Sequence, residues 1–196
     1  MHQLFDLTYI ITEYGYLAIL IIVFLESGIF FPLPGDSLLF TAGLLAPTLG
    51  YNIIFLAFSI FIVAFFGGVA GYYIGTKLDF LYRYSFFRKI FKKKYTDDAH
   101  NFLEKHGLSA MLLSRFIPVV RTFLPIVAGM VRMKYTDFIK YSLLGSAVWS
   151  SVFVFGGYFL GEAFPQIQEY LLYVIIIIVI LSLLPALRHF WKKKHK

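Results

Sequence analysis

The sequence predicts an all-α polytopic membrane protein, and the prediction comes from its composition, its long apolar stretches and its uneven positive charge. Of 196 residues, 59% are hydrophobic and 15% are charged, and the mean hydropathy is +0.75. A soluble domain of this length does not need so much apolar surface, whereas a bundle of membrane helices does. We expect two re-entrant helical hairpins plus transmembrane helices, arranged as an inverted repeat (hairpin–span twice), with an extra C-terminal span.

Positive charge is confined to the later part of the chain. All 18 Lys and Arg residues lie at or after Lys77. All of them except Arg115 and Arg121 gather in three regions: 77–105, 132–140 and 188–196. Loops rich in Lys and Arg stay in the cytoplasm. The sequence therefore predicts that these regions and the C-terminus are cytoplasmic, and that the N-terminus and the turn near Glu162 are outside. Aromatic and basic residues alternate in 80–95, which indicates a helix at the membrane interface rather than a nucleic-acid site.

Three apolar segments are long enough to cross a bilayer, which takes a helix of about twenty residues. They are 53–76, 138–161 and the shorter 171–187. The first carries the chain into the cytoplasm, and the other two carry it out and back. Between the spans, 77–106 is predicted to be a cytoplasmic, amphipathic, basic linker, and 188–196 to be a basic cytoplasmic tail.

Two further apolar segments begin and end on the same side under this topology. The segment 14–47 starts and finishes outside, and 107–131 starts and finishes inside, so both are predicted to be re-entrant hairpins. Each contains helix-breaking residues near its middle: Pro32, Pro34 and Gly35 in the first, Pro118 and Pro125 in the second. Broken backbone at membrane depth is tolerated only where it is buried in protein or lines a watery cavity.

The two hairpins resemble each other in sequence. Pro32 precedes Gly43 by eleven residues in "PLPGDSLLFTAG", and Pro118 precedes Gly129 by eleven in "PVVRTFLPIVAG". Each hairpin is followed by a span with a similar string, "FGGVAGYYIG" or "FGGYFLG". Because one hairpin is entered from outside and the other from inside, the pattern indicates an inverted repeat. In transporters, such repeats place the substrate site at their interface near the midplane.

The hairpins carry charges of opposite sign. The first holds Glu26 and Asp36, and the second holds Arg115 and Arg121. Charges at membrane depth are costly and usually face a cavity where they carry function. We expect the two arginines to bind an anion, phosphate being favoured, and the carboxylates to exchange protons. The alternative is two buried acid–base pairs that only hold the hairpins together.

Several strings resemble the DedA family, also called the SNARE-associated or VTT-domain family, of integral membrane proteins. They are "ESGIFFPLPGD", "GGVAGYYIG", "SRFIPVVRTFLPIVAGM" and "GSAVW", and the resemblance covers residues 15–165. It implies a flippase for an anionic lipid phosphate, undecaprenyl phosphate. In some members it implies instead a translocase for phosphatidylethanolamine. Transport would be coupled to a proton or sodium gradient across the bacterial cytoplasmic (inner) membrane. The family's acids match Glu26 and Asp36, and its arginines match Arg115 and Arg121.

Other functions stay open beside this one. Eukaryotic relatives implied by the resemblance scramble phospholipids without an energy source, and a non-transporting scaffold would leave the buried charges unexplained. A lipid-phosphate phosphatase is disfavoured, because the string that starts at Ser114 has Arg121 and Pro125 where that enzyme class needs His and Asp. The expected partners are membrane lipids, with no nucleic acid. The coupling ion, the lipid and the oligomeric state, a homo-oligomer included, are left open.

The remaining features indicate architecture. Glycines recur every four residues in both spans, which lets helices approach closely in lipid: Gly67, Gly71, Gly75, Gly157 and Gly161. Trp149, Tyr141 and Tyr158 are interpreted as ordinary bundle or interface aromatics. Cysteine is absent, and the five histidines have no metal-ligand spacing. We therefore expect no metal and no cofactor other than the coupling ion.

Overall fold

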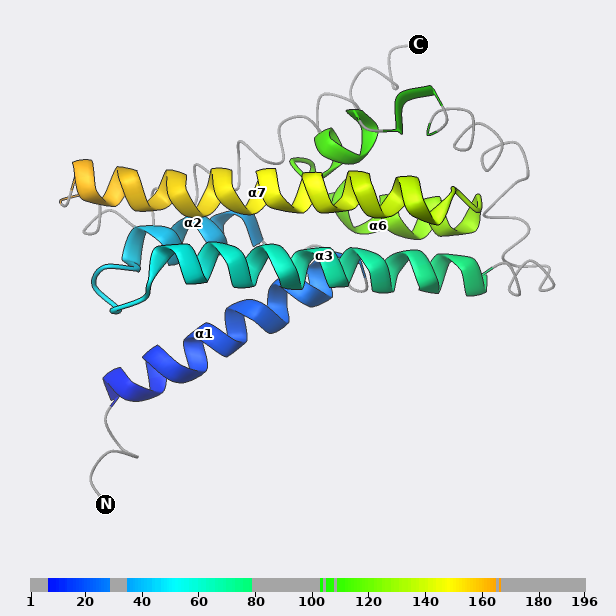
Figure 1. Ribbon diagram of the computed structural model, residues 1–196. Coiled ribbons are helices and arrows are strands. Elements are labelled where there is room, and N and C mark those ends of the chain that lie inside the picture. The colour runs from blue at the N-terminus through cyan, green and yellow to red at the C-terminus, as the bar shows by residue number, and fades with distance from the viewer. Residues whose placement is uncertain are drawn as a thin grey trace, which may run out of the picture.

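Every element in the described part of the structure is helical. The computed structural model describes residues 7–28, 35–78, 103, 105–107, 109–164 and 166 and is drawn in Figure 1. Five helices are bounded within these ranges: α1 (Leu7–Glu26), α2 (Gly35–Leu45), α3 (Ile53–Leu78), α6 (Pro118–Met130) and α7 (Tyr135–Ala163). The prediction of an all-α fold is confirmed.

The two longest helices, α3 and α7, are apolar enough to cross a membrane over Ile53–Lys77 and Tyr135–Ala163. At about 1.5 Å per residue, each exceeds the thickness of a bilayer core of about 30 Å. The predicted segments 53–76 and 138–161 are thus confirmed as long apolar helices, and each helix extends a few residues further. The two helices pack against each other along the middle of the molecule (Figure 1).

Several predicted features lie outside the described residues. These are Pro32 and Pro34, most of the linker 77–106, the span 171–187 and the tail 188–196.

The C-terminal end of α1 and the N-terminal end of α2 both lie near the middle of α3. Figure 1 shows α1 running from the N-terminal side toward that middle, and α2 leading back to the end at which α3 begins. α1 begins at Leu7, ahead of Tyr14, where the predicted hairpin starts. Glu26 is the last residue of α1 and Asp36 the second of α2, so both acidic residues lie at the inner ends of these helices.

A break also divides the segment 107–131. Residues 109–114 are helical, 115–117 form a turn, and α6 begins at Pro118. Ile117 is extended, with φ −117° and ψ 106°, as the residue before a proline favours. Proline suits the first position of a helix, where its missing N–H is not needed.

Pro125 differs from the prediction, because α6 continues through it. The fixed φ of proline is compatible with a helix, so the ring costs a hydrogen bond without ending the helix here. The missing donor is the N–H that would reach the carbonyl of Arg121, four residues earlier. The break of this segment is therefore at Pro118.

Glycines bring α2 into backbone contact with α7. A Cβ atom on Gly43 would collide with the carbonyl of Val154, and one on Gly157 would collide with the carbonyl of Phe40. Side chains at either position would push the two helices apart. The second helix of the first predicted hairpin thus packs on the second predicted span.

The same kind of contact joins α6 to α3. A Cβ atom on Gly129 would collide with the carbonyl of Tyr72, and one on Gly75 with the carbonyl of Ile126. In both interfaces the glycine and the contacted carbonyl are three residues apart on each helix. The second helix of the second predicted hairpin thus packs on the first predicted span.

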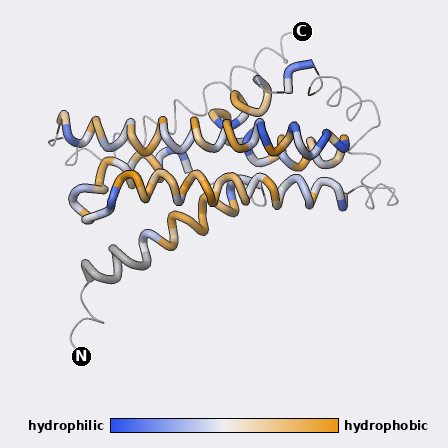
Figure 2. The backbone as a smooth tube through the Cα atoms, viewed as in Figure 1, coloured by the Kyte–Doolittle hydropathy of each residue, from blue (hydrophilic) through white to orange (hydrophobic). Residues whose placement is uncertain are grey.

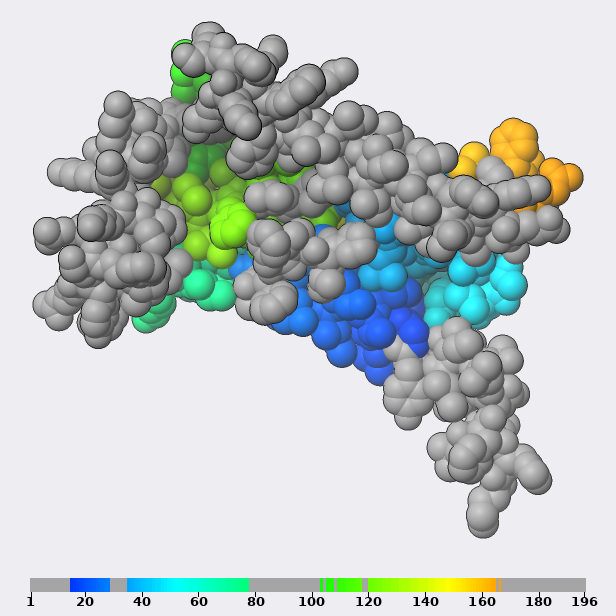
Figure 3. All heavy atoms as spheres, turned by 180° about the vertical axis from the view of Figure 1, so that it is seen from behind, coloured from blue at the N-terminus to red at the C-terminus, as the bar shows by residue number. Residues whose placement is uncertain are grey.

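The buried core divides into two hydrophobic clusters, one around α2 and one around α6. The outer faces of α3 and α7 remain apolar and carry large exposed side chains such as Phe58, Phe66, Val152 and Phe159. Figure 2 shows apolar residues along most of the helices and hydrophilic residues where α6 joins α7. Seen from behind, the inner end of α1 lies beside α6 (Figure 3). This brings residues of both predicted hairpins together in the middle of the molecule.

Candidate functional site

Three charged side chains from three helices meet at this central position. Glu26 ends α1, Asp36 lies in the first turn of α2, and Arg121 lies in the first turn of α6. Each is at most 2% exposed. An unpaired charge buried to this extent costs several kcal/mol. Charges of opposite sign must therefore be paired at this position.

Arg121 pairs with both acids at once. Its Nη1 donates to Oδ1 of Asp36, and its Nη2 donates to Oε1 of Glu26. The planar guanidinium presents two N–H groups side by side, which suits two carboxylate oxygens. One arginine thereby links the two predicted hairpins.

Backbone groups support the two acids. The N–H of Gly35, at the start of α2, donates to Oε1 of Glu26 over 3.3 Å, and Asp36 gains from the positive end of the same helix. Thr122 donates its hydroxyl to the carbonyl of Glu26 over 2.9 Å. A Cβ atom on Gly35 would collide with the carboxylate of Glu26, so this close contact requires glycine.

Trp149 on α7 is a fourth member of the cluster. It is 1% exposed, and its Nε1–H donates to Oδ1 of Asp36 over 2.9 Å. Its ring centroid lies 4.6 Å from the central carbon of the Arg121 guanidinium, which is within cation–π range. The sequence interpretation of Trp149 as an ordinary bundle aromatic missed these contacts. The one signal in the sequence was that Trp149 ends the string "GSAVW", which resembles the DedA family.

Arg115 has different partners from Arg121. It is 3% exposed, and it donates from Nη2 to the hydroxyl of Ser142 over 3.1 Å and from Nη1 to the carbonyl of Ala64 over 3.4 Å. Neither partner carries a charge. Within the described part of the chain, the ion pairs join Arg121, not Arg115, to the acids.

The two arginines therefore enter the core separately. The turn at 115–117 lies between the short helix that precedes it and α6, which carries Arg121. Two negative residues, Glu26 and Asp36, and two positive residues, Arg115 and Arg121, are thus buried in the core.

Some buried polar atoms of described residues, in and beside the charged cluster, have no hydrogen-bond partner. Among the described residues, five buried side-chain atoms have no hydrogen-bond partner: Oε2 of Glu26, Oγ of Ser27, Oδ2 of Asp36, Oγ1 of Thr41 and Nε of Arg121. Buried polar groups are normally paired. The second oxygens of both carboxylates can thus accept a proton or contact a cation without breaking an existing bond.

A row of small polar residues continues along α7. Ser142, Ser146 and Ser150 recur every four residues and are at most 1% exposed. They share the buried face of α7 with Trp149. The row begins at Ser142, the partner of Arg115, and ends at Ser150, next to Trp149 in the sequence. The spacing of these serines was not recognised as a signal in the sequence.

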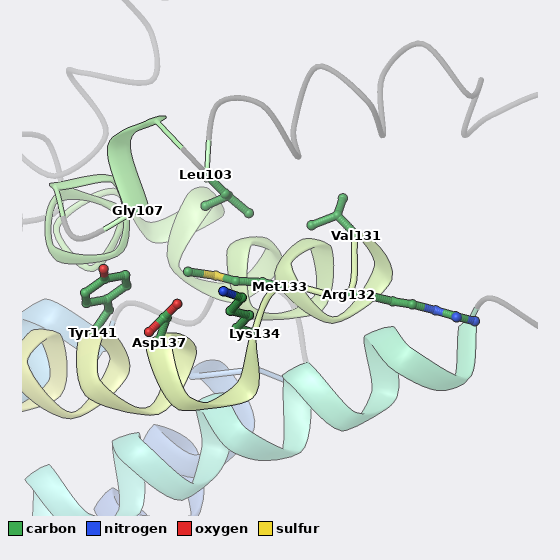
Figure 4. Close-up of a pocket in the computed structure, with 8 residues that line it drawn as sticks. All are labelled: Leu103, Gly107, Val131, Arg132, Met133, Lys134, Asp137 and Tyr141. Carbon is green, nitrogen blue, oxygen red and sulfur yellow. The ribbon is translucent and has the colours of Figure 1, made fainter.

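A separate pocket lies at the junction of α6 and α7. It measures about 380 Å³ and is lined by Leu103, Gly107, Val131, Arg132, Met133, Lys134, Asp137 and Tyr141. Figure 4 shows Lys134, Asp137 and Tyr141 on one wall and Arg132 directed away from them. The pocket includes none of the four central charged residues, so it is distinct from the charged cluster.

The chain is similar to known bacterial membrane proteins over most of its length. A family model described as the VTT domain matches residues 33–159. Protein DedA of Escherichia coli (strain K12) is 38% identical over 197 residues, which cover 95% of this chain and 88% of that protein. This chain belongs to the DedA family of membrane proteins.

Two further members of the DedA family carry informative names. Undecaprenyl phosphate transporter A of Staphylococcus aureus is 30% identical over 201 residues, which cover 96% of this chain and 97% of that protein. Inner membrane protein YqjA of Escherichia coli (strain K12) is 30% identical over 190 residues, which cover 92% and 86%. No solved structure matches this DedA-family chain.

The VTT match includes most of the central cluster. It contains Asp36, Arg115, Arg121 and Trp149, whereas Glu26 precedes its first residue. The resemblance to the DedA family that the sequence strings indicated is confirmed.

Proposed function

We propose that this protein is a lipid transporter that moves an anionic lipid phosphate, with undecaprenyl phosphate as the first candidate, across the bacterial cytoplasmic membrane. The observation that carries the proposal is the ion-paired Arg121, which joins Glu26 and Asp36 where three helices end inside the protein. The name of the Staphylococcus aureus relative supports the substrate class. The protein would act as a transporter and not as an enzyme.

The proposed architecture is an inverted repeat of hairpin and span. The reciprocal glycine contacts support it, because Gly43 packs on α7 in the manner in which Gly129 packs on α3. In this arrangement the hairpins 14–47 and 107–131 enter from opposite sides, and their inner ends meet at Arg121. The placement of Lys and Arg supports an N-terminus outside and a C-terminus in the cytoplasm.

Arg115 would make the first contact with the lipid phosphate. It is a buried cation whose described partners, Ser142 and the carbonyl of Ala64, are neutral. A lipid phosphate would supply the missing negative charge, and a guanidinium suits its oxygens. The lipid tail would remain in the bilayer, beside the apolar outer surfaces.

Arg121 would bind the phosphate only after its ion pairs with Glu26 and Asp36 are broken. Protonation of Glu26 or Asp36, or binding of Na⁺ to their unpaired oxygens, weakens the ion pairs. The freed guanidinium can then join Arg115 on the phosphate. Coupling to the proton or sodium gradient follows, because the ion binds the carboxylates and the lipid phosphate binds Arg121, so that binding of one favours binding of the other.

The test is a headgroup-accessibility assay in reconstituted vesicles. Undecaprenyl phosphate is compared with phosphatidylethanolamine and phosphatidylglycerol, each with and without a pH or sodium gradient. We expect gradient-dependent movement of undecaprenyl phosphate, loss of that movement in Arg121→Ala, and wild-type rates in the exposed control Lys140→Ala. Equal, gradient-independent movement of all lipids would identify a scramblase. No movement of any lipid by folded protein would identify a scaffold.

A further inference from the structure

Trp149 touches both members of the Arg121–Asp36 ion pair. Its indole N–H donates to the Asp36 oxygen that also accepts from Arg121, and its ring lies beside the guanidinium at 4.6 Å. It comes from α7, whereas the charged partners come from α1, α2 and α6. Trp149 is thus the uncharged member of a cluster of otherwise charged side chains.

The two contacts of Trp149 respond differently to protonation of the acids. Protonating Asp36 removes its negative charge and weakens its bond to Arg121, but the indole N–H and the aromatic ring are unaffected by pH. The attraction between the ring and the guanidinium depends only on the cation being present. Arg121 therefore keeps one favourable contact when its ion pairs weaken.

The indole is itself held in a defined orientation. It lies edge to face with Phe153, one turn further along α7, with ring centroids 6.0 Å apart. Phe153 in turn contacts Phe116, in the turn that separates Arg115 from α6. With 1% exposure, Trp149 has little room to move away from Arg121.

We propose that Trp149 is a positioning residue, which keeps Arg121 beside the lipid phosphate site when Glu26 and Asp36 release it. This inference rests on the proposed function. The charged groups around the indole are Glu26 on α1, Asp36 on α2 and Arg121 on α6, with Arg115 beyond the turn. By donating to Asp36, Trp149 also stabilises the carboxylate that holds Arg121.

The first experiment separates the two contacts. Trp149→Phe keeps an aromatic face but loses the N–H donor, and Trp149→Leu loses both. The carboxylate of Asp36 loses a hydrogen-bond donor in Trp149→Phe, so we expect the pH midpoint of transport to move upward by about one to two units. Trp149→Leu should reduce transport at every pH, because Arg121 loses its remaining contact. The control, Val152→Leu, changes an exposed apolar residue of the same helix, away from the charged cluster, and should leave the midpoint in place.

The second experiment uses the indole as its own reporter. The chain has two tryptophans, so Trp191→Phe leaves Trp149 as the sole source of indole fluorescence. In vesicles, we expect its emission to shift with pH and with added undecaprenyl phosphate. In an added Asp36→Asn substitution the pH-dependent part should be lost.

The outcomes distinguish this inference from the proposed function. Wild-type transport rates and an unchanged pH midpoint in both Trp149 variants would refute the positioning role while leaving the transporter intact. An emission insensitive to both pH and lipid would refute it as well. If no lipid is moved by any variant, but the emission follows pH and requires Asp36, then the positioning contact stands and the proposed function fails.

Discussion

Arg121, in the first turn of α6, is ion-paired with Glu26 at the end of α1, although 95 residues separate them in sequence. The pair connects the inner ends of helices from both predicted hairpins. Glu26 ends its helix at the negative pole of the helix dipole, where a carboxylate is disfavoured. The positive charge of Arg121 compensates for that position, so burial of either residue without the other is unfavourable.

Removing one partner of a buried pair therefore has a large cost. The remaining charge is left without compensation, at about 3–5 kcal/mol. Substitutions that keep the shape of the site are therefore the informative ones.

Arg121→Lys should fail nearly as badly as Arg121→Ala. A lysine ammonium cannot donate in parallel to Asp36 and Glu26, nor lie flat beside Trp149, as the guanidinium does. Loss of one charged hydrogen bond predicts a fall in transport of about 10- to 100-fold. The measurement is the initial rate of lipid movement in vesicles. A lysine variant with wild-type rate would show that a point charge suffices.

Gly68→Ala should disturb Arg115 without removing it. An added methyl group would lie 3.1 Å from Nη2 of Arg115 and 3.1 Å from Oγ of Ser142, which is tighter than ordinary contact. We expect the guanidinium to be displaced from Ser142 and the apparent affinity for the lipid to fall. Titration of the rate against lipid content measures it. The lipid-facing control Phe66→Leu should keep the wild-type affinity, and an unchanged affinity in Gly68→Ala would argue against Arg115 as the phosphate contact.

Glu26→Gln should change how transport depends on pH. The amide oxygen of glutamine can still accept from the N–H of Gly35 and from Arg121, so the fold is expected to survive. The side chain can no longer exchange a proton, so the rate should vary less steeply with pH. Rates measured over a pH series test this. If the profile of the variant overlays that of the wild type, Glu26 has no coupling role.

The sequence predicted the members of the central cluster better than their pairing. Glu26, Asp36 and Arg121 stood out because charges in apolar segments are costly, and that physical rule does not depend on the fold. Arg115 stood out for the same reason, but its neutral partners depend on the turn at 115–117, which directs it toward α3 and α7. Pairing is a property of the packed helices, and spacing along one segment does not determine it.

Other features were invisible in the sequence for physical reasons. A tryptophan in an apolar helix has many ordinary roles, and only its contacts with Asp36 and Arg121 distinguish Trp149. Pro125 was predicted to break its helix, yet a helix can lose one hydrogen bond and continue. By contrast, the glycines at four-residue spacing indicated close packing against a hairpin, and Gly157 and Gly75 do contact α2 and α6, the second helices of the two predicted hairpins.

The neighbouring glycines Gly156 and Gly157 provide a test of that packing within one turn of α7. A Cβ atom on Gly157 would collide with the carbonyl of Phe40 in α2, whereas one on Gly156 would have its nearest neighbour at 3.9 Å. Forcing extra atoms into a packed interface costs about 1–3 kcal/mol, so Gly157→Ala should lower the thermal stability of the detergent-solubilised protein by several degrees. Gly156→Ala should be neutral or slightly stabilising, because alanine favours a helix over glycine.

Because α2 carries Asp36, the same pair of variants also tests whether the α2–α7 interface positions the site. Moving α2 away from α7 would lengthen the bond from Trp149 to Asp36, so transport should fall in Gly157→Ala and persist in Gly156→Ala. Both quantities can be measured on one preparation, by thermal unfolding and by vesicle assay. Equal stability in the two variants would mean that α2 and α7 do not pack through Gly157 in the membrane.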